Sequence, residues 1–180
     1  MKRSGGRGHH GAVSPCPSVT VQPVSGATRS AVLALRVHPE QVPFSGEMPE
    51  LLTQAEADPR SVAMCVLEGG EVVGYFRLDS SPGAVARRDF GPGSVGVRAL
   101  FIDRERQGRG LGTAAMLALA GWLREQRPEV RRVVLSVNFR NPAATCAYRK
   151  VGFVIRGAPY LGGCAGPQHV MELELGEKGR

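Results

Sequence analysis

The chain has 180 residues, of which 42% are hydrophobic and 22% charged, enough for one domain with a buried core, and this composition excludes a disordered chain. The formal net charge is +7, but the arginines are scattered and only 6% of the residues are aromatic, so we expect no nucleic-acid partner. The four cysteines are too widely spaced for paired zinc ligands or a disulfide scaffold, which indicates no metal and a reducing cytoplasm. No stretch approaches the ~20 apolar residues of a membrane span.

The first half of the chain predicts strands and short helices behind a leader. Residues 1–18 are rich in glycine, serine and proline and predict a flexible leader, followed by a domain over residues 19–176. A strand is predicted from residue 19, a helix over 30–37 and a second short helix over 49–57. Two β-prone runs, 61–67 and 72–78, enclose Gly69-Gly70, a pair typical of a hairpin turn.

The second half alternates strands with helices. Its prolines and glycines predict a loop over 80–94, and a strand follows over 95–102. The longest helix begins after Gly112 and ends before Pro128, and a shorter one begins at Asn141-Pro142. The remaining strands are expected at 133–137, 154–158 and 169–175. This order predicts an α/β (α+β) fold with a mixed sheet.

The segment Arg106 to Gly112 stands between a predicted strand and the longest helix. Backbone N–H groups at a helix N-terminus, reached through glycines, bind phosphate, and Arg106 and Arg109 would add mobile positive charge. No Lys-Ser or Lys-Thr follows, which excludes a P-loop, and glycines spaced by two do not fit the dinucleotide fingerprint. A glycine-rich turn without a ligand remains the alternative from this segment alone.

Two motifs in this order resemble those of the GNAT superfamily of acyl-CoA-dependent N-acyltransferases. The first comprises Gln107, Gly110 and Gly112, and the second comprises Asn141, Ala144, Tyr148, Lys150, Gly152 and Phe153. The resemblance covers about residues 19–175. It implies a mostly antiparallel GNAT-type sheet flanked by helices, with splayed central strands, and acetyl-CoA (coenzyme A) as the acyl donor.

The resemblance also implies roles for individual residues. The backbone of the strand before the glycines would bind the pantetheine arm, and one of its N–H groups would stabilise the oxyanion. The loop amides would hold the pyrophosphate, with Thr113 close behind. Asn141 would reach the cofactor arm or only cap its helix. The cofactor-binding residues implied are Leu100, Phe101, Ile102, Gln107, Gly108, Arg109, Gly110, Leu111, Gly112, Thr113, Asn141 and Lys150.

Tyr148 is the implied catalytic residue, because related enzymes hold a phenol near the thioester sulfur. Expulsion of a thiolate calls for a nearby acid. The alternative is that the ring of Tyr148 only packs on the core. The general base is unassigned, since the strand 95–102 carries Arg98 and no carboxylate. Asp79 or a water chain could serve, although Asp79 is equally typical of a turn.

The acceptor is the least determined part of the prediction. Residues 37–58 loosely resemble the front segment of bacterial diamine and polyamine acetyltransferases. Their acidic residues would attract a cationic amine or form a solvated helix face. We expect a small-molecule amine acceptor; a protein acetyltransferase and a non-catalytic acyl-CoA sensor are the alternatives. A homodimer is compatible with an exposed sheet edge. The acidic residues are Glu47, Glu50, Glu56 and Asp58.

Overall fold

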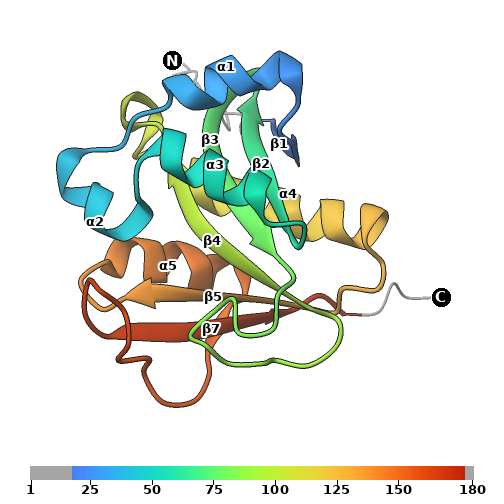
Figure 1. Cartoon of the computed structure of the whole chain (residues 1–180), viewed down its shortest axis with the longest axis vertical. Coiled ribbons are helices and arrows are strands. Elements are labelled where there is room, and N and C mark those ends of the chain that lie inside the picture. Colours follow the sequence, from blue (N-terminus) through green and yellow to red (C-terminus); the bar gives the residue numbers. More distant parts are fainter. Residues whose placement is uncertain (1–17, 177–180) are drawn as a thin grey trace, which may run out of the picture.

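The structure, a computed structural model, describes residues 18–176, so nearly all of the predicted leader lies outside the described residues. One sheet is covered by helices on both faces (Figure 1). The strands are β1 (Val19–Pro23), β2 (Ser61–Glu68), β3 (Glu71–Asp79), β4 (Ser94–Ile102), β5 (Arg132–Asn138), β6 (Val154–Ile155) and β7 (Gln168–Glu174). The helices are α1 (Gly26–Ala34), α2 (Val42–Ser45), α3 (Met48–Ala57), α4 (Leu111–Gln126) and α5 (Pro142–Val151), with 3-10 turns η1 (Pro39–Gln41) and η2 (Arg104–Arg106).

Within residues 18–176 the sheet has seven strands in the order β1-β2-β3-β4-β5-β7-β6. Only β4 and β5 are parallel neighbours, because α4 crosses from the end of one to the start of the other. β2 and β3 are joined by Gly69-Gly70, whose φ angles of 58° and 90° suit the tight hairpin turn predicted for this pair. The prediction of a mixed, mostly antiparallel sheet flanked by helices is confirmed.

Two apolar clusters lie on opposite faces of the sheet. Figure 1 shows α1 and α3 in front of the sheet and α4 behind it. Neighbouring residues of β2 supply opposite faces, since side chains alternate along a strand: Cys65 belongs to the cluster that contains Val32 of α1, and Met64 belongs to the cluster that contains Leu119 of α4. Both β2 side chains are fully buried. The sheet is therefore a rigid support for the loops at its edges.

β4 and β5 are paired at one end only. Their register runs from Ser94↔Arg132 to Val97↔Leu135 and stops, although both strands continue. Beyond that point β4 stays on β3 through a bulge, at which Ala99 has a φ of 53°. The two central strands separate there, as predicted, and the gap between them leads into the cavity described below.

Some element boundaries differ from the prediction. α1 begins earlier than residue 30, because Ser25 and Thr28 form a capping box, and it ends at Ala34, where Leu35 turns to extended backbone. No helix was predicted over residues 39–45, where the structure has η1 and α2. The strand predicted over 154–158 is reduced to Val154–Ile155, and Gly157, with a φ of 70°, turns the chain away.

No helix in the described part of the chain is long and apolar enough to cross a membrane. The same residues contain no group of three or more histidine, cysteine or acidic side chains that could hold a metal ion.

Candidate active site

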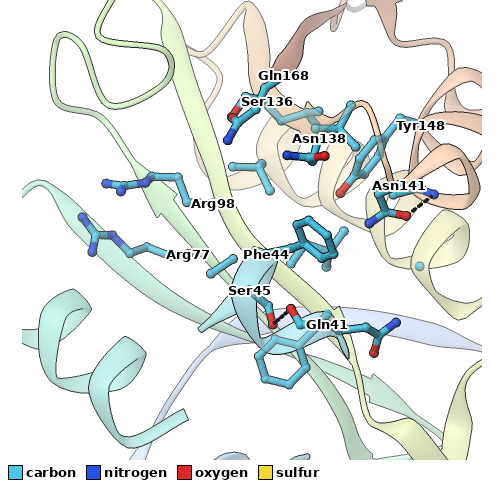
Figure 2. Close-up of a pocket in the computed structure, with 18 of the residues that line it drawn as sticks. Gln41, Phe44, Ser45, Arg77, Arg98, Ser136, Asn138, Asn141, Tyr148 and Gln168 are labelled. Carbon is cyan, nitrogen blue, oxygen red and sulfur yellow. Dashed lines mark hydrogen bonds between the residues drawn. The ribbon is translucent and has the colours of Figure 1, made fainter. Parts of the chain in front are cut away.

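A cavity of about 810 Å³ lies where β4 and β5 separate. Its walls come from the α2 and α3 segments, β3, the loop between β3 and β4, β4, the residues before α4, β5, the helix α5 and the chain between β6 and β7. Figure 2 shows Asn141 and Tyr148 on one side of this space and Arg77 and Arg98 on the other. The cavity therefore joins both sequence motifs to residues that neither motif contains.

Leu100, Phe101 and Ile102 line the cavity from β4. Because β4 has no pairing with β5 beyond Val97, the backbone groups on this edge face the gap instead of a neighbouring strand. The ring of Phe101 packs against Tyr75 at a centroid distance of 6.1 Å. The peptide groups of this edge are thus able to bind an extended ligand, as a free strand edge binds an added strand.

The residues before α4 present backbone N–H groups that have no partner within residues 18–176. Gly108 and Gly110 have φ angles of 77° and 75°, which glycine adopts without strain. In the described part of the chain, the first N–H after Arg106 to donate to a backbone carbonyl is that of Ala114, which bonds Gly110 at 3.0 Å. A Cβ on Gly108, Gly110 or Gly112 would meet no atom within 4 Å. This open row of donors, with Leu111 beginning the helix, fits a pyrophosphate.

The two arginines of this loop are held by the β2–β3 hairpin. Arg109 donates to both carboxylate oxygens of Glu68, at 2.9 and 2.7 Å. Arg106 donates to Glu71 at 2.7 Å and approaches Glu68 at 3.5 Å. These contacts differ from the mobile positive charge expected from the sequence, because the hairpin brings two acidic residues beside the loop. Arg106 lines the cavity and Arg109 does not.

The side chain of Gln107 connects the loop to two other walls. Its Nε2 donates to the carbonyl of Ile102 at 2.9 Å and to Oε1 of Gln41 at 2.8 Å. Nε2 of Gln41 in turn donates to Oε1 of Gln107 at 3.1 Å. The sequence did not predict Gln41 as a site residue, because no local signal links two residues that are 66 positions apart.

Asn141 caps α5 and lines the cavity. Its Oδ1 accepts the N–H of Ala144 at 3.1 Å, and Pro142 follows at the first helical position. Among the described residues, its Nδ2 has no hydrogen-bond partner. The capping role is therefore present, and the amide nitrogen is available to a ligand as well.

Tyr148 lies two turns along α5, and its hydroxyl points toward the cavity (Figure 2). Its ring packs against Phe153 at a centroid distance of 5.7 Å, so the predicted packing alternative also describes it. The hydroxyl makes no hydrogen bond to another residue in 18–176. Burial raises the pKa of Tyr148 to about 12. The phenol thus keeps its proton near neutral pH and is free to donate it to a ligand.

The side chains of Thr113 and Lys150 are not brought to the cavity. Thr113 is half-buried in the first turn of α4. Lys150 is exposed in the last turn of α5, where a positive charge meets the negative end of the helix dipole. Within the described part of the chain, neither side chain has a contact that explains a role in cofactor binding.

The acidic residues of the α2–α3 region also lie off the cavity wall. Glu56 forms an exposed ion pair with Arg29 at 3.1 Å. Asp58 accepts the N–H of Arg60 at 3.0 Å and the hydroxyl of Ser61 at 3.1 Å. The sequence allowed two interpretations of these acids, attraction of a cationic amine or a solvated helix face, and these contacts fit the solvated face. Glu47 and Glu50 fit it as well, because they do not line the cavity.

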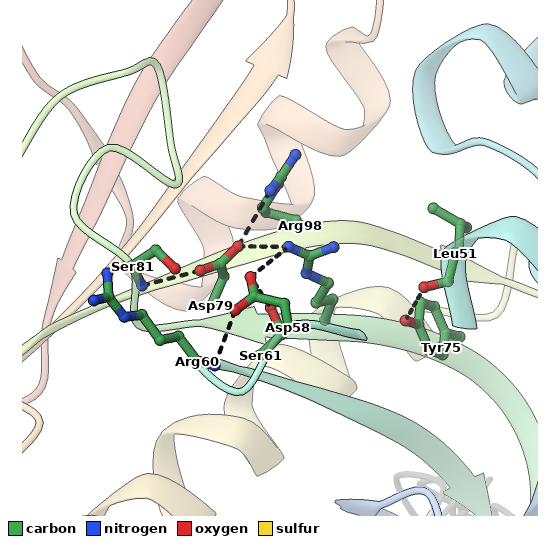
Figure 3. Close-up of polar contacts among 9 residues, drawn as sticks. Leu51, Asp58, Arg60, Ser61, Tyr75, Asp79, Ser81 and Arg98 are labelled. Carbon is green, nitrogen blue, oxygen red and sulfur yellow. Dashed lines mark hydrogen bonds and ion pairs between the residues drawn. The ribbon is translucent and has the colours of Figure 1, made fainter. Parts of the chain in front are cut away.

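Asp79 is held by arginines rather than exposed to a substrate. Its Oδ2 accepts hydrogen bonds from Arg77 at 2.8 Å and Arg98 at 3.1 Å, and its Oδ1 accepts the N–H of Ser81 at 3.0 Å (Figure 3). Burial acts to raise the pKa of Asp79, but the hydrogen bonds from Ser81, Arg77 and Arg98 lower it below its ordinary value. A carboxylate in this state is a poor proton acceptor. Among the described residues, no aspartate or glutamate lines the cavity.

Comparison with known proteins gives the chain clear relatives. A model described as the Acetyltransferase (GNAT) family matches residues 29–153. The spermine/spermidine N(1)-acetyltransferase of Bacillus subtilis is 27% identical over 140 residues, 78% of this chain and 90% of the relative. The mycothiol acetyltransferase of Saccharomonospora viridis is 32% identical over 72% of this chain, which spans 44% of that protein. The crystal structure of aminoglycoside acetyltransferase AAC(6')-Ib in complex with coenzyme A superposes with a TM-score of 0.68 at 21% identity, covering 87% of this chain and 95% of the other.

Proposed function

Because the family model matches residues 29–153, the chain belongs to the Acetyltransferase (GNAT) family, and we propose that it transfers acetyl from acetyl-CoA directly to a primary amine of a small molecule. The family, the enzyme class and the use of acetyl-CoA predicted from the two motifs are confirmed. The residues that perform the reaction are part of the proposal.

One observation carries the assignment of the site. A single cavity contains both the open N–H row before α4 and the free hydroxyl of Tyr148. The backbone of Gln107 to Gly112 would hold the pyrophosphate, and the free edge of β4 at Leu100 to Ile102 would hold the pantetheine arm. Asn141 would add its Nδ2. In this proposal Arg109 contributes its backbone N–H, while its guanidinium anchors the loop to Glu68.

Tyr148 is assigned as the acid of the reaction. The acyl donor supplies an activated carbonyl; the amine nitrogen bonds to its carbon, and the carbon–sulfur bond breaks. Tyr148 donates its proton to the departing sulfur, which suits a phenol whose raised pKa keeps it protonated. A backbone N–H of the β4 edge would stabilise the oxyanion. The proton lost by the amine goes to water, because no carboxylate or histidine of residues 18–176 lines the cavity, and water returns a proton to the Tyr148 phenolate.

Relatives and cavity size favour a small acceptor. The relative from Bacillus subtilis is named for spermine and spermidine, and solved structures of similar fold are named for aminoglycosides. A cavity of about 810 Å³ suits the acetyl-pantetheine end together with a small amine. The competing possibilities are a protein lysine or N-terminal acetyltransferase and an acyl-CoA sensor without turnover.

Release of coenzyme A thiol from acetyl-CoA, measured against small amines and a lysine peptide, tests the proposal. We expect turnover with at least one small amine, and calorimetry gives acetyl-CoA binding independently. A preference for the peptide would favour the protein acetyltransferase. Binding of acetyl-CoA without any turnover would favour the sensor, and absence of binding would overturn the assignment of the cavity.

The location and the assembly are proposals too. The proposed location is the cytoplasm, because the sequence predicts unpaired cysteines and a reducing compartment keeps thiols unpaired. Among the cysteines that the structure describes, Cys146 and Cys164 are exposed free thiols. A homodimer would use the edge strand β6, where Val154 is 45% exposed. Analytical ultracentrifugation distinguishes the dimer from a monomer.

A further inference from the structure

The charged side chains that line the cavity are all arginines within residues 18–176. They are Arg77, Arg87, Arg98 and Arg106. Amines with several positive charges, such as polyamines, are attracted by carboxylates, and this wall offers them none. The wall instead suits an acceptor that carries a negative charge.

Arg77 and Arg98 form a pair at one end of the cavity. They face each other across the register of β3 and β4, and both donate to the same oxygen of Asp79. The Asp79 side chain is 1% exposed, whereas that of Arg98 is 46% exposed. Arg77 also approaches Asp58 at 3.5 Å. The two acids thus lie behind the arginines, which are the residues that face the cavity.

Both guanidinium groups have unused donors. Arg77 is only 8% exposed, and its buried Nε has no hydrogen-bond partner in the described structure. Arg98 uses Nη1 for Asp79, and in residues 18–176 its other N–H groups have no partner. A guanidinium edge with two free N–H groups matches the two oxygens of a carboxylate. Arg87, exposed on the same wall, adds a further charge without an ion pair among these residues.

The arginine pair lies close to the proposed site of acyl transfer. Arg98 is two residues from Leu100, and the bulge at Ala99 lies between them. Figure 2 shows Arg77 and Arg98 on the opposite side of the cavity from Tyr148. A molecule a few bonds long can therefore place an amine at the acyl group and a carboxylate at Arg98.

We propose that the natural acceptor is a small amino acid, whose carboxylate is bound by Arg98 with Arg77 behind it. This inference rests on the proposed function and makes it more specific. It also distinguishes the chain from the polyamine acetyltransferases that it resembles, since the acidic residues expected to attract a polyamine lie off the cavity wall.

Matched acceptors test the inference. Thiol release from acetyl-CoA is measured with lysine against cadaverine, ornithine against putrescine, and β-alanine against its amide. The members of each pair share the amine and differ in the carboxylate or its charge. We expect kcat/KM to be about 10- to 100-fold higher for the carboxylate-bearing member, as a lost charged hydrogen bond would give. Equal or reversed preference overturns the inference and leaves the proposed function in place. A preference for 2-aminoethyl phosphate overturns the choice of carboxylate.

Substitutions of Arg98 test whether this residue causes the preference for a carboxylate-bearing acceptor. Arg98→Met keeps the aliphatic stem, and we expect it to remove the preference for the carboxylate while acetyl-CoA affinity is unchanged. Arg98→Lys keeps the charge without the planar fork and should restore only part of the preference. Arg60→Met is the control, because Arg60 is exposed and does not line the cavity. The same loss in Arg60→Met would mean a general charge effect and would overturn the site.

Calorimetry separates this inference from the proposed function. Amino acids are titrated into the enzyme in the presence of coenzyme A. Binding that Arg98→Met abolishes, without turnover of any amine, supports the carboxylate site and contradicts the acetyltransferase proposal. Neither binding nor turnover with any member of the panel overturns both.

Discussion

Gln41 and Gln107 exchange side-chain hydrogen bonds in both directions, at 2.8 and 3.1 Å. One belongs to η1 in the cavity wall, and the other begins the loop proposed to bind pyrophosphate. A third bond, from Gln107 to the carbonyl of Ile102 at 2.9 Å, fixes the end of β4 to the same point. One amide pair therefore holds together three walls of the cavity.

A double-mutant cycle tests the importance of this pair. Gln107→Ala should weaken acetyl-CoA binding about tenfold, because the loop loses its bonds to Gln41 and Ile102. Gln41→Ala should weaken it less, and the two changes should be coupled by about 1 kcal/mol, since the residues are in contact. Calorimetric affinities give the cycle, with Gln126→Ala on the exposed end of α4 as control. Additive effects would show that the pair does not position the loop.

Replacement of the phenol tests the assignment of the acid. Tyr148→Phe keeps the packing on Phe153 and removes only the hydroxyl. We expect kcat to fall about 100-fold or more, as for loss of a general acid, with acetyl-CoA affinity nearly unchanged. Cys146→Ala, an exposed change on the same helix, is the control. An unchanged kcat in Tyr148→Phe would remove this residue from the mechanism.

The pH dependence follows from the groups in the cavity. Tyr148, with a pKa raised to about 12, stays protonated through the working range, so loss of the acid should not lower the rate below about pH 11. Among the described residues no carboxylate or histidine lines the cavity, so the only required deprotonation is that of the acceptor. We expect kcat/KM to rise with pH toward the pKa of the acceptor amine and to shift when an acceptor of different pKa is used. An apparent pKa near 6 to 7 shared by both acceptors would reveal an enzymatic base instead.

The fold could be predicted because its signals are local. Gly69-Gly70 between two β-prone runs indicates a hairpin, and Asn141-Pro142 with Gly152 marks both ends of α5. The bulge at Ala99 could not be predicted, because a left-handed alanine is imposed by packing between β3 and β4 and not by its own preference. α1 was shifted for a related reason: the capping box at Ser25 outweighs the apolar pattern that begins later.

The candidate site was predictable only where its residues lie in motifs. Gly110, Asn141 and Tyr148 stand in short patterns, and all three line the cavity. Gln41 and Arg77 stand in no pattern and reach the cavity through contacts distant in sequence. Likewise the ion pair of Arg109 with Glu68 depends on the hairpin register, so the sequence alone suggested a free charge.

A charge placed in the glycine loop tests the phosphate site. Gly110 has a φ of 75°, and a Cβ there meets nothing within 4 Å, so the backbone strain is the main structural cost. Gly110→Asn imposes the same strain without charge, and asparagine tolerates this conformation. We expect Gly110→Asp to bind acetyl-CoA at least tenfold more weakly than Gly110→Asn, because its carboxylate repels phosphate. Calorimetry on both variants gives the comparison, and equal affinities would contradict a phosphate at this position.

The buried Asp79 should make stability depend on acid pH. Its folded-state pKa lies below the ordinary value of 3.8, so its ion pairs stabilise the fold fully above that value and are lost as the pH falls through the folded pKa. Asp79→Asn removes the negative charge that Arg77 contacts at 2.8 Å and leaves that arginine without its close ion pair. We expect a loss of about 3 kcal/mol in the free energy of unfolding at pH 7, the low end for a broken buried ion pair, because Arg98 is half exposed. Urea unfolding at pH 7 and pH 3 measures it, and the difference from the wild type should shrink at pH 3, because the carboxylate of the unfolded wild type takes up its proton below its ordinary pKa of 3.8. Glu56→Gln, which breaks an exposed pair with Arg29, should leave stability nearly unchanged at both pH values. A difference between Asp79→Asn and the wild type that is equally large at pH 3 would mean that the hydrogen bonds of Asp79, and not its charge, stabilise this end of β3.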